Sequence, residues 1–208
     1  MSRAFRFVLL ALAPCGLVAC GSSAKAGPAL SVPSAVSWAA PADPMALAGA
    51  AGLTPETAER LQYHVHSHLD VFLDGAKIVV PAGIGIDITD PAVHTFVVDG
   101  QDQYGGISVP CAKACISPLH THDVSGVLHT ESATRKNNTL GQFFVEWNVK
   151  LTATCVNTFC TPAKAVAVYV DGKKFTGDPT TIPLTNHKEI AIVVGTPPPT
   201  IPNSYTWA

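Results

Sequence analysis

Short segments in which apolar and polar residues alternate recur along most of this chain. The clearest runs from His64 to Leu73, and the pair Asp74-Gly75 separates it from another such segment at 77–80. Alternation with a period of two is typical of strands that bury one face, and Asp-Gly is a preferred two-residue hairpin turn. Further segments of this kind lie at 93–98, 117–131, 168–174 and 190–194. The chain is therefore expected to fold mainly as antiparallel strands.

We predict one mainly β domain over residues 53–208, either an antiparallel sandwich or a partly closed barrel, with one or two short helices. Thr54-Pro55-Glu56 has the residue types of a helix start, and Thr139–Trp147 is the second helix candidate. The aromatic residues of the second candidate would also suit a strand. If it is a helix packed across the sheet, the alternative is an α+β, grasp-like fold.

Seven of the eight histidines lie between His64 and His129, and six of them form three clusters. The first is His-x-His-x-His at 64–68, the second is His-x-His at 120–122, and His129 is the third. Side chains two apart on a strand point to the same face, so each cluster would aim its imidazoles one way. Imidazole is the commonest protein ligand for zinc and copper, so the pattern predicts a metal site built on a sheet.

The clustered histidines cannot all bind the same ion. His64 and His68 would lie about 13–14 Å apart on a strand that rises about 3.3 Å per residue, so we treat His64 as peripheral. Five imidazoles exceed the three protein ligands of many catalytic zinc sites, so either two ions bind or some histidines orient others. The predicted ligands are His66, His68, His120, His122 and His129. The candidates for an orienting role or an extra ligand are His64, Asp70, Cys115, Asp123 and Glu131.

Imidazole and carboxylate donors favour copper or zinc as the ion. A binding module would sequester or deliver the metal, whereas an enzyme would keep one coordination position for a substrate. His120-Thr121-His122 is similar to the His-x-His of cupin oxygenases, but Asp123 is adjacent to it and Glu131 lies nine residues beyond His122, so the cupin carboxylate spacing is absent. A metal-dependent oxygenase or hydrolase is the alternative function. A third interpretation is that the histidines are pH-sensitive structural groups.

The N-terminus predicts export. Arg3 and Arg6 precede the apolar run 7–13, and Leu17-Val18-Ala19-Cys20 resembles the lipobox of bacterial lipoproteins, in which the cysteine is lipidated. This resemblance implies a signal peptide at 1–19 and a lipid on Cys20. An ordinary secretory signal or a short membrane anchor is the alternative. Residues 20–52 are rich in Ala, Pro and Ser, which is typical of a tether. The expected location is the bacterial cell envelope, outside the cytoplasm.

Four cysteines follow the tether, and an even number in an oxidising compartment favours two disulfides. Cys111–Cys115 and Cys155–Cys160 can close locally, whereas crossed pairs would join the two halves of the domain. The competing role for Cys115 is a thiolate ligand near His120. The formal net charge of −2 comes with no evident basic patch, so nucleic acid is not an expected partner.

Four segments together resemble a histidine-rich domain of exported bacterial proteins. They read His-Leu-Asp-Val-Phe-Leu-Asp-Gly, Val-Pro-Ala-Gly-Ile-Gly-Ile, Leu-His-Thr-His-Asp and Leu-Gly-Gln-Phe-Phe. The resemblance extends over most of the chain after the tether. It implies an exported domain and no particular activity.

Overall fold

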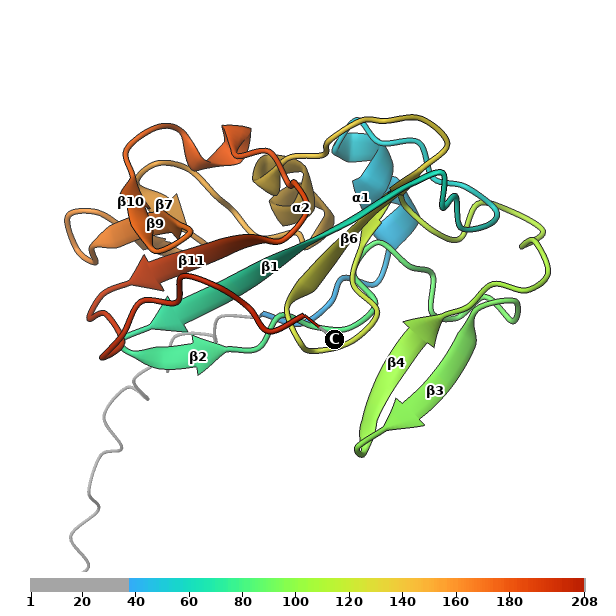
Figure 1. Ribbon diagram of the computed structural model, residues 1–208, viewed down its shortest axis with the longest axis horizontal. Helices are drawn as coiled ribbons and strands as arrows, with labels where there is room; N and C mark the ends of the chain where they lie inside the picture. The colour runs from blue at the N-terminus through green and yellow to red at the C-terminus, as the bar shows by residue number, and fades with distance from the viewer. Residues whose placement is uncertain (1–37, 208) are drawn as a thin grey trace, which may run out of the picture. The chain divides into compact units, whose positions relative to one another are not determined.

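A computed structural model describes residues 38–207 of the chain (Figure 1). The predicted signal peptide at 1–19, Cys20 and the tether up to residue 37 lie outside the described residues. No helix within 38–207 combines the length and the apolar composition that a membrane-spanning helix requires.

One seven-stranded sheet dominates the structure. Its strands are β1 (Tyr63–Leu73), β2 (Ala76–Ile78), β5 (Leu119–His120), β6 (Val127–Ser132), β9 (Val166–Val170), β10 (Lys173–Phe175) and β11 (Lys188–Val194). The strand order is β10-β9-β11-β1-β6-β5, and β2 pairs with β1. β1 pairs with β11 in parallel, and the other pairings in this sheet are antiparallel. Figure 1 shows β1 running through the middle of the sheet.

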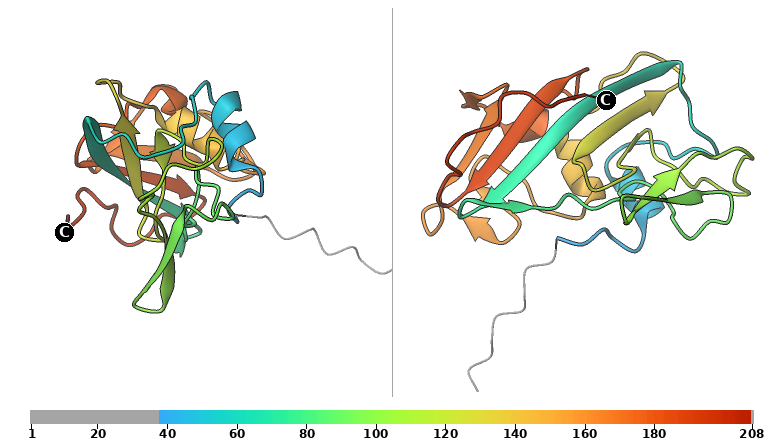
Figure 2. Two further views of the ribbon diagram at one scale, coloured as in Figure 1. Left: turned by 90° about the vertical axis from the view of Figure 1, so that its right-hand side faces the viewer. Right: turned by 60° about the horizontal axis from the view of Figure 1, so that its bottom comes forward.

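Three Asp-Gly pairs form hairpin turns, and the turn predicted at Asp74-Gly75 is one of these pairs. They connect β1 to β2, β9 to β10, and β3 (His94–Val98) to β4 (Gln101–Gly105). In the first, Asp74 has a φ of 50° and Gly75 a φ of 83°. Two successive residues with positive φ make a type I′ turn, whose twist matches that of the strands and which Asp and Gly tolerate best. The β3–β4 hairpin is a separate sheet that projects from the body of the domain (Figure 2).

The two faces of the large sheet differ in chemistry because side chains alternate along each strand. Leu69 and Val71 of β1 and Ile190 and Ile192 of β11 lie on one face and are buried in the main core. The even-numbered side chains of β1, from His64 to Asp70, point to the other face. The histidines are therefore separated from the hydrophobic core by the thickness of the sheet.

A second layer covers the apolar face. It contains α1 (Pro44–Ala50), α2 (Leu140–Glu146), the short 3-10 helix η1 (Pro179–Thr181) and the hairpin of β7 (Cys155–Val156) and β8 (Phe159–Cys160). Thr139 and Gln142 form a reciprocal capping box at the start of α2, which satisfies backbone N–H groups that a helix start leaves unpaired. Phe143 and Phe144 then pack into the core. The predicted helix at 139–147 is thus confirmed.

Two predictions about the N-terminal part of the domain are wrong. Residues 44–50, assigned to the tether, form α1, and Ala48 is fully buried in the main core, so the folded domain begins before residue 53. The helix predicted to start at Thr54 does not form. Glu56 is extended instead, and its N–H donates to the Ile116 carbonyl at 2.7 Å. This long-range pairing outweighs the local preference for a helix.

The structure decides between the disulfide pairings. Cys111 bonds to Cys115 and Cys155 bonds to Cys160, so both disulfides are local and the crossed pairs do not form. Cys115 is consequently unavailable as a thiolate ligand, and that candidate role is wrong. Two disulfides are consistent with an oxidising compartment outside the cytoplasm.

The predicted fold class is confirmed. Strands account for far more of the described chain than the two short α-helices do, and the sheets do not close into a barrel. Of the two predicted forms the barrel is therefore excluded, and the layered arrangement is consistent with a sandwich. The alternative, an α+β, grasp-like fold, depended on a helix packed across the sheet. α2 does pack on the sheet in this way, but the domain remains mainly β.

Candidate metal centre

Strand pairing brings the three histidine clusters together on the polar face of the sheet. His66 of β1 lies opposite His129 of β6, and His129 lies opposite His120 of β5. These three side chains therefore form a row across adjacent strands. The next row contains His64 opposite Glu131. His122 follows His120 after β5 ends.

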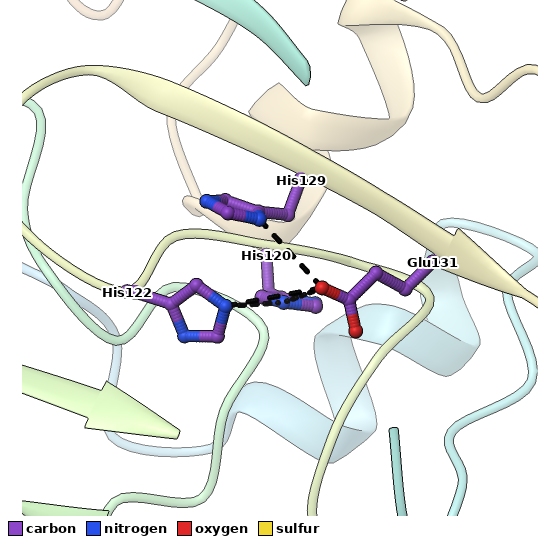
Figure 3. A group of neighbouring side chains, drawn as sticks. All are labelled: His120, His122, His129 and Glu131. Atoms are coloured by element: carbon purple, nitrogen blue, oxygen red, sulfur yellow. Dashed lines mark hydrogen bonds and ion pairs between the residues drawn. The ribbon is translucent and has the colours of Figure 1, made fainter. Parts of the chain in front are cut away.

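The Glu131 carboxylate lies at the centre of this group. Its Oε1 is 3.6 Å from Nδ1 of His129, 3.7 Å from Nε2 of His120 and 4.0 Å from Nε2 of His122, as Figure 3 shows. The two Nε2 atoms of His120 and His122 are 3.2 Å apart. All four ligand atoms lie within 4.8 Å of one another.

These separations suit a metal ion. Ligand atoms about 2.0–2.1 Å from an ion and at tetrahedral angles lie about 3.4 Å from each other. The observed values of 3.2–4.0 Å bracket that separation. The other oxygen of Glu131, Oε2, is buried without a hydrogen-bond partner among the described residues. A buried carboxylate with so few donors indicates that a cation would stabilise it.

Backbone carbonyls orient two of the imidazoles. Nδ1 of His120 is 2.8 Å from the Ser117 carbonyl oxygen, and Nδ1 of His122 is 2.5 Å from the Tyr104 carbonyl oxygen. A carbonyl only accepts, so in each ring Nδ1 carries the proton and Nε2 keeps its lone pair for the site. This arrangement, in which the second ring nitrogen is held by a backbone oxygen, is usual for metal-binding histidines.

The protonation states also suit metal binding. Burial lowers the pKa of His120 to about 3, and the neighbouring His122 adds to this effect. Burial acts to raise the pKa of Glu131, but contacts with His122 and His129 outweigh it and hold that pKa well below its usual range. At neutral pH the site therefore combines a neutral imidazole with a charged carboxylate, which are the forms that bind metal.

A second group adjoins the first. Nε2 of His64 is 2.8 Å from Nε2 of His66 and 3.5 Å from Nδ1 of His129. These three residues also meet the condition that their ligand atoms lie within 4.8 Å of one another. His129 thus belongs to both groups. His64, which we expected to be peripheral, is also 3.2 Å from Oε1 of Glu131.

His68 is placed in a different group, contrary to the prediction that it joins His66. Its Nδ1 is 2.8 Å from Oε2 of Glu189 on β11, and its Nε2 is 3.0 Å from the Ser125 carbonyl oxygen. Both ring nitrogens therefore have partners within the protein. Asp70, the next residue on this face, pairs with Lys77 at 2.6 Å. His68, Asp70 and Glu189 form a buried polar network that could hold a metal ion, but neither ring nitrogen of His68 is free to bind one.

Replacing His68 by alanine is expected to destabilise the fold without weakening metal binding at the first group. Removing one partner of a buried pair typically costs about 3–5 kcal/mol. We expect a loss of stability at the lower end of this range. Burial raises the pKa of Glu189, so its carboxyl group can take up a proton when His68 is lost. Urea unfolding should show the loss of stability, and a metal titration should show an unchanged affinity at the first group. Weaker metal binding with unchanged stability would place His68 in the metal site instead.

The other candidate residues have different roles. Oδ1 of Asp123 accepts from the Ser125 N–H at 2.8 Å and so shapes the turn after His122. His94 is exposed on β3, and its Nε2 is 3.4 Å from the Ser108 hydroxyl. The sequence predicts no role for His187, but its N–H donates to the His66 carbonyl at 2.7 Å and its ring stacks on Trp207.

A pocket of about 440 Å³ reaches the site from the side of the β3–β4 hairpin. Three carboxylates, Glu59, Asp123 and Glu131, line it together with apolar side chains such as Leu61 and Phe96. Glu59 was not predicted to have any role; its Oε1 accepts from the Gly106 N–H at 2.9 Å. Nothing in the local sequence marks Glu59, because it follows no alternating pattern and comes into the site from a loop.

No family model, no curated protein and no solved structure matches this chain. The interpretation of the site therefore depends on its own geometry.

Proposed function

We propose that the protein binds a divalent transition metal, copper or zinc, outside the cytoplasm. Three imidazole nitrogens and the Glu131 oxygen, mutually spaced as the ligands of one ion, are the observation that supports this function. His120, His122, His129 and Glu131 would hold the ion. It would be a Lewis acid, and as copper also a redox centre.

The donor set favours these two metals. The four cysteines in the described part of the chain are oxidised to disulfides, so thiolate ligands are excluded there. Imidazole with one carboxylate suits Zn(II) and Cu(II), and the general affinity order places copper highest. Hard oxygen-binding cations such as Mg²⁺ and Ca²⁺ prefer all-oxygen sites.

A metal-dependent enzyme is the second candidate function, and the pocket beside His122 and Glu131 favours it. A pure storage site needs no cavity of this size at its ligands. Because the pocket is lined by carboxylates, it would accept a neutral or cationic molecule more readily than an anion. Glu59 is the residue that could move a proton there, since its carboxylate lies at the pocket wall.

Metal analysis of the protein purified without a polyhistidine tag tests the proposed function. We expect the protein, after exposure to Cu(II) or Zn(II) and removal of free ion, to retain metal with micromolar or tighter affinity. A protein that retains neither ion and shows no such affinity would contradict the proposal. The histidines would then be structural groups.

The proposed location depends on lipidation of Cys20. Replacing Cys20 by alanine is expected to move the protein from the membrane fraction to the soluble fraction, because the lipid on Cys20 is the proposed source of its membrane affinity. The unfolding curve of the released protein should match that of wild type, since the described domain begins well after residue 20. Membrane fractionation measures where the protein is found, and N-terminal sequencing shows where its chain has been cleaved. A soluble wild-type protein whose N-terminus lies downstream of residue 30 would contradict lipid anchoring.

A further inference from the structure

The histidines on the polar face outnumber the ligands that one ion needs. Five imidazoles and one carboxylate gather there, and they divide into the group of His120, His122, His129 and Glu131 and the group of His64, His66 and His129. Ligand atoms of a single ion with bonds of about 2.1 Å cannot lie more than about 4.2 Å apart, which is the separation of opposite ligands. The separations given above within each group, 2.8–4.0 Å, are below that limit, and two groups of this kind match two ions.

We propose that this face holds two metal ions side by side. The inference rests on the proposed function and adds a second ion to it, bound by His64 and His66. The Nε2 atoms of these two histidines are 2.8 Å apart, close to the separation of neighbouring ligands at right angles around one ion.

Glu131 lies between the groups and can serve both ions, whereas His129, although a member of each group, can give the lone pair of its Nδ1 to one ion only. Oε1 of Glu131 is 3.2 Å from His64 in one group and 3.7 Å from His120 in the other. Carboxylates commonly bridge paired ions, which lie about 3.5–4 Å apart in two-metal sites. The backbone explains this arrangement, since β6 lies between β1, which carries the second group, and β5, which carries the first.

The C-terminal segment covers His66 of the second group. The Trp207 ring is stacked over that of His66 with centroids 6.2 Å apart, and Tyr205 stacks on His68 at 4.0 Å. Figure 1 shows this segment returning across the sheet toward β1. The second ion would therefore lie beside an aromatic cover on its His66 side, and on its His64 side it would adjoin the same open pocket as the first ion. Because Glu131 is the one carboxylate in the two groups, charge repulsion should make the second ion bind more weakly than the first.

The number of bound ions in the full-length protein tests the inference. We expect wild type to bind two Zn(II) or Cu(II) ions in two resolved steps, measured by calorimetric titration and by metal content. His66→Gln should bind one ion, and the affinity of the first step should remain close to that of wild type. His94→Gln, with a histidine removed from the exposed hairpin, should still bind two. In the Cu(II) form, the two ions should show magnetic coupling in electron paramagnetic resonance, and His66→Gln should give the spectrum of an isolated ion.

The outcomes separate this inference from the proposed function. Wild type that binds one ion, with His66→Gln unchanged, overturns the two-ion centre and leaves the single site intact. Wild type that binds no ion overturns the proposed function and with it this inference. Two ions retained in both His66→Gln and His64→Gln would place the second ion elsewhere and overturn the assignment. Circular dichroism of each variant shows that a lost ion does not reflect a lost fold.

Discussion

Replacing His122 by alanine is expected to lower the affinity for the first Cu(II) or Zn(II) ion by more than about 100-fold. Loss of a group that merely orients a ligand typically costs about 10–100-fold, and His122 supplies a ligand atom itself. Its Nε2 is directed toward Glu131 and His120 by the bond from Nδ1 to the Tyr104 carbonyl.

His120→Ala should weaken binding to a similar extent, but His120 is fully buried and its loss can also destabilise the fold. His122 is partly exposed, so the fold should tolerate its replacement better. Competition with a chromophoric chelator measures the affinities, and urea unfolding of the metal-free variants controls for stability. His94→Ala is the matched control, since it removes an imidazole outside both groups. Equal losses in His94→Ala and His122→Ala would mean that the clustered site does not bind the metal.

The second large effect concerns Glu146 and the pH dependence of stability. Glu146 ends α2 with its side chain in the protein interior, and neither carboxylate oxygen has a hydrogen-bond partner among the described residues. Burial raises the pKa of this carboxyl from 4.5 to about 8, and the nearby Ser117 hydroxyl offsets only part of the rise. The folded protein therefore holds Glu146 protonated at neutral pH.

The sign of the effect follows from linkage. Because the pKa is higher in the folded state than in the unfolded state, protonated Glu146 contributes its full stability below pH 4.5 and loses it progressively as the pH rises to about 8. A rise of this size corresponds to about 5 kcal/mol in the free energy of unfolding. This would be a large share of the stability of a domain of this size.

Glu146→Gln tests this directly, since glutamine has nearly the same shape and does not ionise. We expect wild type to lose about 5 kcal/mol relative to the variant between acidic pH and pH 8, at about 1.4 kcal/mol per pH unit. Urea unfolding of both proteins across that range measures the difference, and the comparison cancels the titration of all other groups. A difference that does not change with pH would show that the Glu146 carboxylate is ionised and solvated in the folded protein.

Alternation and turn chemistry explain why much of the fold was predictable. The pattern from His64 to Leu73 predicts β1 almost to the residue, and Asp74-Gly75 predicts its hairpin. These signals are local, because a strand with one buried face needs a period of two and a type I′ turn needs positive φ. The assignment of residues 44–50 to the tether and the helix at Thr54 were predicted wrongly, because packing of α1 on the core and the pairing of Glu56 with Ile116 are long-range contacts.

The sequence by itself determined that His64, His66 and His68 share one face of a strand, and that His120 and His122 lie close together. It did not determine which of them meet, because strand partners and register depend on contacts between distant segments. The antiparallel pairing of β1 with β6 brings His66 to His129 and places Glu131 among the imidazoles. The parallel pairing of β1 with β11 puts Glu189 beside His68, so a buried contact with this carboxyl group removes from the site a histidine that periodicity alone had placed in it.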